Sequence, residues 1–87
     1  MRLEQLQYLF EISNSKSISI ASENLYVSQP ALSRAVKNLE EELGVTLLFR
    51  TVDGVRLTKA GQSLLPEMKE IIEKTKQLSK HAINFSA

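Results

Sequence analysis

Apolar residues recur every three or four positions through most of this chain, with polar residues between them. Near the N-terminus this spacing is carried by Leu3, Leu6, Leu9, Phe10 and Ile12. It predicts a helix from Leu3 to about Ser13, followed by a polar turn at 14–17. Ser17 or Ser19 can accept hydrogen bonds from free amide groups and start a second helix, which points Ala21 and Leu25 inward.

A third helix is predicted to begin after Ser28, an N-cap residue, with Pro30 in its first turn and Gly44 at its end. Its apolar stripe consists of Leu32, Val36, Leu39 and Leu43. Nearly opposite this stripe, at about 100° per residue, stand Pro30, Arg34, Lys37 and Glu41, with Ser33 on the flank. One side of the helix should therefore dock on the domain, while the other is left to meet a partner.

Residues with high β-propensity surround Asp53-Gly54, a common hairpin turn dipeptide. They predict two short strands, 47–51 and 55–57, which together form a wing. Thr58 is a suitable N-cap for a long last helix over 59–83. Pro66 within this helix predicts a kink or a locally broken turn, because proline removes a backbone hydrogen bond.

The last helix carries a heptad-like seam, in which steps of four and three alternate through Leu64, Met68, Ile71, Thr75, Leu78 and Ala82. Packing inside the chain's own core is the alternative explanation for these residues. However, a helix of about 36 Å is longer than three preceding helices can cover, and its later apolar residues would stay exposed. A second copy is the simplest cover, so we expect a homodimer interface formed by Leu64, Leu65, Met68, Ile71, Ile72, Thr75 and Leu78.

Length, charge and composition narrow the class of protein. The 87 residues allow one small domain, and a hydrophobic content of 43% is that of an ordered chain. The absence of cysteine excludes disulfides and favours a cytoplasmic location. The net charge is only +1, but Arg34 and Lys37 lie early in the third helix and Glu40, Glu41 and Glu42 at its end. We interpret the three glutamates as a solvated helix end that limits non-specific affinity for DNA.

Four segments follow one another almost without gaps: LEQLQYLFEI, then SISIASENLYVSQPALSRAVKNLEEELGVTLL, then a wing ending in GVRLT, and finally KAGQSLLPEMKEII. In this order they resemble the N-terminal DNA-binding domain of LysR-type transcriptional regulators. The resemblance implies a mainly α fold: a winged helix-turn-helix over 1–58, with three helices and a two-stranded wing, then a linker helix that pairs two subunits and a frayed C-terminus over 59–87. Family members carry a larger C-terminal domain that senses a small-molecule inducer. This chain stops where that domain would begin, so we expect an excised fragment or a truncated relative, without an inducer site of its own.

The resemblance also implies which residues meet DNA, and the chemistry of the side chains agrees. Gln29 can pair in bidentate fashion with adenine, and Arg34 with guanine or a phosphate. Pro30 offers an apolar edge to a thymine methyl group, while Ser28 and Ser33 can bond phosphates. The expected DNA contacts are Ser28, Gln29, Pro30, Ser33, Arg34, Lys37 and Arg50. For three of them a simpler interpretation stays open: Ser28 as a cap only, Pro30 as a helix starter only, and Lys37 as a solvated lysine.

Two positions depart from the family's usual pattern. Asp53 stands at the wing tip, where Arg or Lys is common. Phosphates repel a carboxylate, so a minor-groove contact from the wing would fall to Arg50. Ser22 replaces the second residue of the usual Ala-Ala pair in the second helix, and we expect it only to adjust packing.

The leading hypothesis is sequence-specific binding of double-stranded DNA, as a homodimer on an interrupted palindrome, in transcription regulation. The third helix would enter the major groove, and the wing would lie near the adjacent backbone or minor groove. The alternative is a winged-helix module for protein interaction and dimerisation that does not bind DNA. An enzyme is poorly supported, because the chain has no cysteine, a single histidine (His81) and no glycine-rich phosphate loop. No cofactor, metal or membrane contact is expected.

Overall fold

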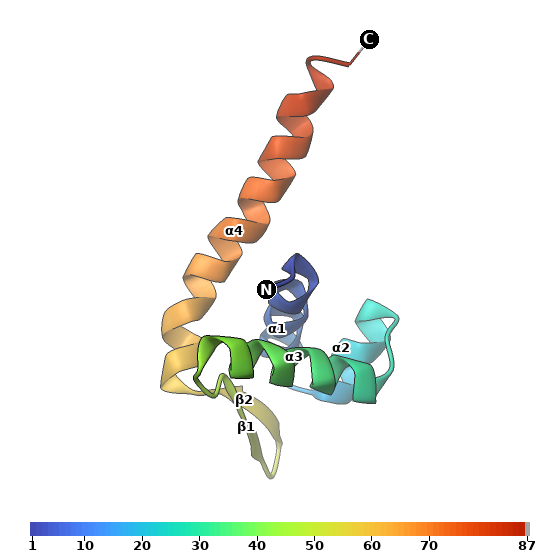
Figure 1. The fold of residues 1–87 in the computed structure, drawn as a ribbon. Helices are drawn as coiled ribbons and strands as arrows, with labels where there is room; N and C mark the ends of the chain where they lie inside the picture. The colour runs from blue at the N-terminus through green and yellow to red at the C-terminus, as the bar shows by residue number, and fades with distance from the viewer. Residues whose placement is uncertain (87) are drawn as a thin grey trace.

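A computed structural model describes residues 1–86. This part of the chain forms the three helices and two strands of the predicted winged fold, followed by a long final helix (Figure 1). In chain order the elements are α1 (Leu3–Ser15), α2 (Ile18–Leu25), α3 (Gln29–Leu43), β1 (Leu48–Thr51), β2 (Gly54–Leu57) and α4 (Lys59–Ile83). Helices α1, α2 and α3 pack on one another, and the antiparallel hairpin of β1 and β2 projects from them (Figure 1). Because α4 runs well beyond this body, the molecule measures 52 × 25 × 19 Å.

The ends of the helices follow the predicted capping residues. Ser17, Ser28 and Thr58 each accept a hydrogen bond from the backbone N–H three residues later. Gly44 ends α3 with φ 73°, in the left-handed region that favours glycine. Helix α4 has the predicted bounds, and it continues through Pro66 as one helix. Of the two alternatives predicted at Pro66, the broken turn is therefore wrong and the kink stays a prediction. Pro66 lies on an exposed side, where water can bond the carbonyl that the proline leaves unpaired.

The core is built from one face of each helix and the base of the wing. Its buried apolar residues are Leu6, Leu9, Ile12, Ala21, Leu32, Val36, Leu39, Leu47, Val55, Met68 and Ile72. Three of the four residues in the predicted stripe of α3 are among them, and the fourth, Leu43, packs partly against the cluster. The predicted split of α3 into an inner apolar face and an outer polar face is confirmed.

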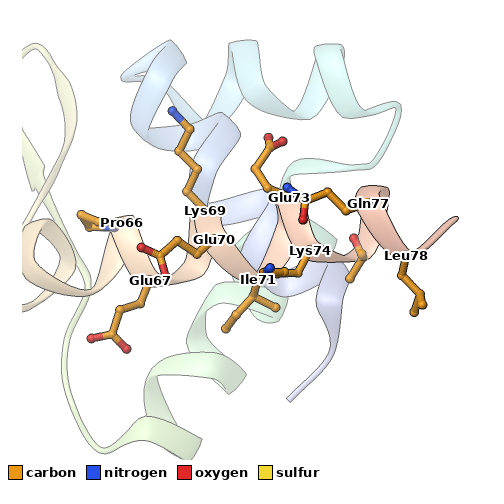
Figure 2. A pocket seen from close by; sticks show the side chains of 10 residues that line it. Pro66, Glu67, Lys69, Glu70, Ile71, Glu73, Lys74, Gln77 and Leu78 are labelled. Carbon is orange, nitrogen blue, oxygen red and sulfur yellow. The ribbon is translucent and has the colours of Figure 1, made fainter. Parts of the chain in front are cut away.

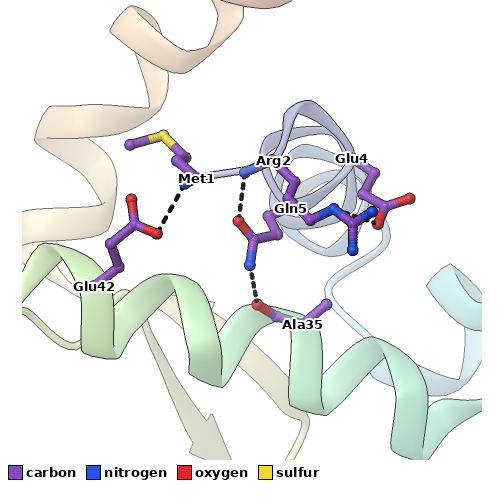
Figure 3. Close-up of polar contacts among 6 residues, drawn as sticks. All are labelled: Met1, Arg2, Glu4, Gln5, Ala35 and Glu42. Atoms are coloured by element: carbon purple, nitrogen blue, oxygen red, sulfur yellow. Dashed lines mark hydrogen bonds and ion pairs between the residues drawn. The ribbon is translucent and has the colours of Figure 1, made fainter.

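Polar contacts hold α3 against the start of α1 (Figure 3). The buried carboxamide of Gln5 accepts a hydrogen bond from the Arg2 backbone N–H at 2.8 Å and donates one to the Ala35 carbonyl at 3.4 Å. The Met1 ammonium lies 2.9 Å from a carboxylate oxygen of Glu42, near the C-terminal end of α3, where positive charge complements the helix dipole. These contacts fix the position of α3 relative to the body.

Candidate nucleic-acid interface

The outer face of α3 presents the residues that the sequence marked for DNA contact. Gln29, Pro30, Arg34 and Lys37 are exposed, and Ser33 is half-buried on the flank. Ser28 is exposed too, although its hydroxyl already accepts the capping hydrogen bond from the Ala31 N–H at 3.2 Å. Within residues 1–86, no carboxylate forms an ion pair with Arg34, Lys37 or Arg50. Their charges are therefore available to an external anion.

Arg50 does not stand apart from α3 but shares a groove with it. In the hairpin Arg50 pairs with Val55, whose side chain is buried, so both residues leave the hairpin on the side that faces the body. Arg50 and Gln29 together line a groove of about 280 Å³ between the wing and the N-terminal ends of α2 and α3. Hydroxyl groups of Ser17, Ser19 and Thr51 line the same groove. None of these three was predicted as a site residue from the sequence, because only the tertiary fold brings them beside Arg50.

A side chain at the far end of α3 positions the base of the wing. The Glu40 carboxylate accepts hydrogen bonds from the backbone N–H groups of Leu47 at 2.7 Å and Leu48 at 3.2 Å. The prediction of a fully solvated cluster of glutamates is therefore wrong for Glu40, although Glu41 and Glu42 are exposed. The reason lies in the fold, which returns the chain past the last turn of α3 with two N–H groups that lack another partner.

A second attachment ties the wing to the turn between α1 and α2. The Val55 N–H donates to the Lys16 carbonyl at 3.2 Å. Gly54 has φ 139°, and a Cβ on it would meet the same carbonyl oxygen well inside van der Waals contact. Glycine is therefore required at position 54 for two reasons: the positive φ disfavours other residues, and a Cβ atom would collide with the Lys16 carbonyl oxygen. With attachments on two sides, the wing is held in a defined position relative to α3.

Replacing Glu40 with alanine should lower the free energy of unfolding by about 1 to 3 kcal/mol, because two partly buried N–H groups lose their acceptor. Chemical denaturation followed by circular dichroism measures the change. The matched control is Glu41→Ala, which removes the exposed neighbouring carboxylate and should have little effect. Equal stabilities of the two variants would show that Glu40 does not hold the wing.

The tip of the wing carries two exposed residues, Val52 and Asp53. The Thr51 hydroxyl donates to the Gly54 carbonyl at 3.2 Å and closes the turn below them. Asp53 forms no ion pair within the described part of the chain. The foremost charge of the wing is thus negative, while the positive charge of Arg50 lies further back, in the groove.

The predicted dimer seam of α4 divides into two sides. Met68 and Ile72 are buried in the chain's own core, and Leu64 and Leu65 pack partly against it. The prediction that these residues form the homodimer interface is therefore corrected for Met68 and Ile72, because α1 and the base of the wing already cover that side of α4. Ile71 and Leu78 remain exposed, at 46% and 70% of their surface. Figure 2 shows them on one side of α4 with Glu67, where they line an open hollow, and Thr75 borders it half-buried.

Two other classes of site have no support in residues 1–86. These residues contain no group of three His, Asp or Glu side chains that could hold a metal ion. His81, near the end of α4, stacks at a tilt on Phe85, with 5.6 Å between the ring centroids. No helix in this part of the chain is long and apolar enough to cross a membrane. The predicted frayed end includes Ala87, which lies outside the described residues.

Comparison with known proteins finds one family along most of the chain. The family model for bacterial regulatory helix-turn-helix proteins of the lysR family matches residues 3–62. The uncharacterized HTH-type transcriptional regulator YbhD of Escherichia coli K12 is 43% identical over 72 residues, which are 83% of this chain and 23% of the relative. The regulator TcbR of Pseudomonas sp. strain P51 is 37% identical over 73 residues, or 84% and 25% of the two chains. The chain thus spans about a quarter of the length of these curated relatives.

Solved structures match the whole fold, including α4. The DNA-binding domain of CbnR in complex with DNA superposes with a TM-score of 0.93 at 31% identity and covers 100% of both chains. The corresponding domain of BenM with benA site 1 DNA gives a TM-score of 0.92 at 30% identity, over 99% of this chain and 100% of that one.

Proposed function

The chain belongs to the lysR family of bacterial regulatory helix-turn-helix proteins, and from this premise we propose that it binds double-stranded DNA sequence-specifically in transcription regulation. The observation that carries the proposal is the outer face of α3, where Gln29 and Arg34 are exposed on a helix whose other face is buried. Polar and basic side chains on a firmly docked, exposed helix suit the major groove. Since bacterial DNA lies in the cytoplasm, that is the compartment we propose.

The side chains of α3 and its N-cap contact two different parts of the DNA, the base edges and the phosphates. Gln29, at the first position of the helix, pairs with adenine, and Arg34 reads guanine from the next turn. Pro30 contacts a thymine methyl group, while Ser28, Ser33 and Lys37 contact phosphates. These phosphate contacts fix the position of the protein on the duplex without selecting a sequence.

The wing binds the sugar-phosphate strand beside the major groove. When α3 lies in that groove, the adjacent strand enters the groove of the protein that Arg50 and Gln29 line. The hydroxyl group of Ser19 supplies a further donor there, because a phosphate oxygen accepts from hydroxyls as well as from guanidinium, whereas the Thr51 hydroxyl already donates to the Gly54 carbonyl. Asp53 keeps the tip of the wing out of the minor groove, since the negative potential in that groove is strong.

Two copies bind together through the outer face of α4. Ile71 and Leu78 form its apolar centre, with Glu67 four residues before Ile71 and Lys74 three residues after it. In a parallel pair, Glu67 would lie level with Glu67 of the second copy, and Lys74 with Lys74, so that like charges would face each other. An antiparallel pair centred between Glu70 and Ile71 sets Glu67 opposite Lys74 of the second copy, so we propose the antiparallel orientation. The two α3 helices then reach half-sites of an interrupted palindrome in successive major grooves.

Salt dependence tests the proposal directly. Cognate sequences are first selected from random duplexes, and affinity is then measured by fluorescence anisotropy over a range of salt concentrations. Each phosphate that the protein neutralises should add about −0.9 to the slope of log affinity against log salt. Arg50 and Lys37 in two copies predict a slope of about −4 or steeper. A chain that dimerises but shows no salt-sensitive affinity for any duplex would contradict DNA binding and favour a protein-interaction module.

A further inference from the structure

The core contains a buried carboxamide that joins α1 to α3. Within residues 1–86, only Gln5 and Ser22 combine a polar side chain with burial, at 8% and 6% of their surface exposed. The Ser22 hydroxyl donates within its own helix, to the Ser19 carbonyl at 2.8 Å. The Gln5 amide donates instead to the Ala35 carbonyl (Figure 3), and it forms the only hydrogen bond between a side chain of α1 and α3 in this part of the chain.

The contacts around this hydrogen bond are apolar. Leu6 and Leu9 of α1 belong to the same buried cluster as Val36 of α3. Burial of apolar surface has no preferred direction, so packed helices can slide or turn by about 1 to 2 Å and stay buried. A hydrogen bond weakens steeply once its atoms are misaligned, and a buried amide without its partner is costly. Gln5 therefore restricts α3 to one rotation and one axial position on α1.

The residue that Gln5 contacts lies next to the side chains proposed to read bases. Ala35 directly follows Arg34, and Gln29 begins the same helix. Turning α3 by about 20° would move side-chain atoms that lie about 6 Å from its axis by about 2 Å. A bidentate hydrogen bond to a base edge does not survive such a displacement. The attraction between a charged side chain and a phosphate changes more gradually with distance, so phosphate contacts would largely persist.

We propose that Gln5 is a positioning residue for sequence discrimination, which holds α3 in the orientation in which Gln29 and Arg34 meet the base edges. The inference rests on the proposed function and adds to it a buried residue that does not contact DNA itself. Loss of the Gln5 amide lowers affinity for cognate sequences. Affinity for random sequences is unchanged, because it depends on phosphate contacts.

Gln5→Met tests the proposal, because methionine is similarly long and unbranched but carries no amide. The Ala35 carbonyl keeps its helical bond from the N–H four residues later, and Arg2 is exposed, so water can accept from its N–H. The thermal midpoint should therefore stay close to that of the wild type. Affinity, measured by fluorescence anisotropy at fixed salt, should fall about tenfold for a duplex with one cognate half-site and stay unchanged for a random duplex.

A second variant separates this role from helix capping. Gln5 also accepts a hydrogen bond from the Arg2 N–H and so caps the start of α1. Gln5→Glu keeps that acceptor and the shape of the side chain, but an ionised carboxylate has no hydrogen to donate to the Ala35 carbonyl. This variant should lose discrimination as Gln5→Met does. Wild-type discrimination in Gln5→Glu would show that Gln5 only caps α1 and would overturn the proposal.

Ser22→Ala is the matched control, since it removes the other buried polar side chain, whose hydrogen bond stays within α2. It should leave both affinities unchanged. Wild-type discrimination in Gln5→Met would overturn the proposal. Equal losses of affinity for the two duplexes, or loss of the fold in both Gln5 variants, would overturn it as well, because Gln5 would then serve the fold in general. A wild type that binds cognate and random duplexes equally would instead overturn the proposed function.

Discussion

Placing glutamates at both Ile71 and Leu78 should leave the chain monomeric and weaken binding to a two-half-site duplex by about 100-fold or more. Both side chains are exposed in the single chain, so the core is undisturbed. In a dimer they would be buried, and unpaired carboxylates there are costly. Joining two binding modules raises affinity by about 10²–10⁴, and that gain is lost with the dimer. Analytical ultracentrifugation and fluorescence anisotropy measure the two effects.

A duplex with one half-site shows whether the substitutions have damaged α3. The doubly substituted chain should bind this duplex with the affinity of the wild type, because one copy is enough to bind one half-site. Lys76→Glu is the control on the helix, since Lys76 is exposed on the side of α4 away from Leu78. Persistence of dimers in the doubly substituted chain would rule out this face as the interface. The antiparallel orientation has its own check: Lys74→Glu should weaken the dimer, and adding Glu67→Lys should restore it.

The parts of the fold that local rules govern were predictable from the sequence. The spacing of Leu32, Val36 and Leu39 fixed which side of α3 faces the core, and hence which side Gln29 and Arg34 occupy. Capping by Ser28 and Thr58 requires only nearby backbone groups, so the starts of α3 and α4 agree with the prediction. The dipeptide Asp53-Gly54 located the hairpin only to within one residue, because the two turn residues are Val52 and Asp53, and Gly54 already begins β2.

Features that depend on distant segments were not predictable in this way. The heptad-like spacing of α4 is equally compatible with packing inside the chain and with packing between two chains. Only the contact with α1 shows that Met68 is buried in the chain's own core, whereas Ile71 stays exposed. The role of Glu40 depends on where the chain returns after α3. The groove around Arg50 forms between α2, α3 and the wing, and the order of these elements along the chain does not predict that they meet there. Periodicity describes one element at a time, whereas each of these features joins two or more.

Replacing Arg34 with alanine should weaken binding to the cognate duplex by about 1 to 3 kcal/mol, measured by fluorescence anisotropy at fixed salt. The side chain is exposed and has no ion-pair partner within residues 1–86, so the variant should fold normally. Arg56→Ala is the matched control: this guanidinium is also exposed, but it pairs across the hairpin with Phe49, on the face away from the groove. Its loss should change affinity little.

The same position distinguishes a base contact from a phosphate contact. If Arg34 reads guanine with both arms of its guanidinium, Arg34→Lys keeps the charge but loses the planar fork, so discrimination between cognate and random duplexes falls. If Arg34 binds only a phosphate, Arg34→Lys restores most of the affinity, and Arg34→Ala reduces the salt slope by about 1 with no loss of discrimination. We expect the first result, because Arg34 projects from the middle of the exposed face of α3, whereas Lys37 lies one turn closer to the glutamates at its end. Unchanged affinity in Arg34→Ala would remove this residue from the interface altogether.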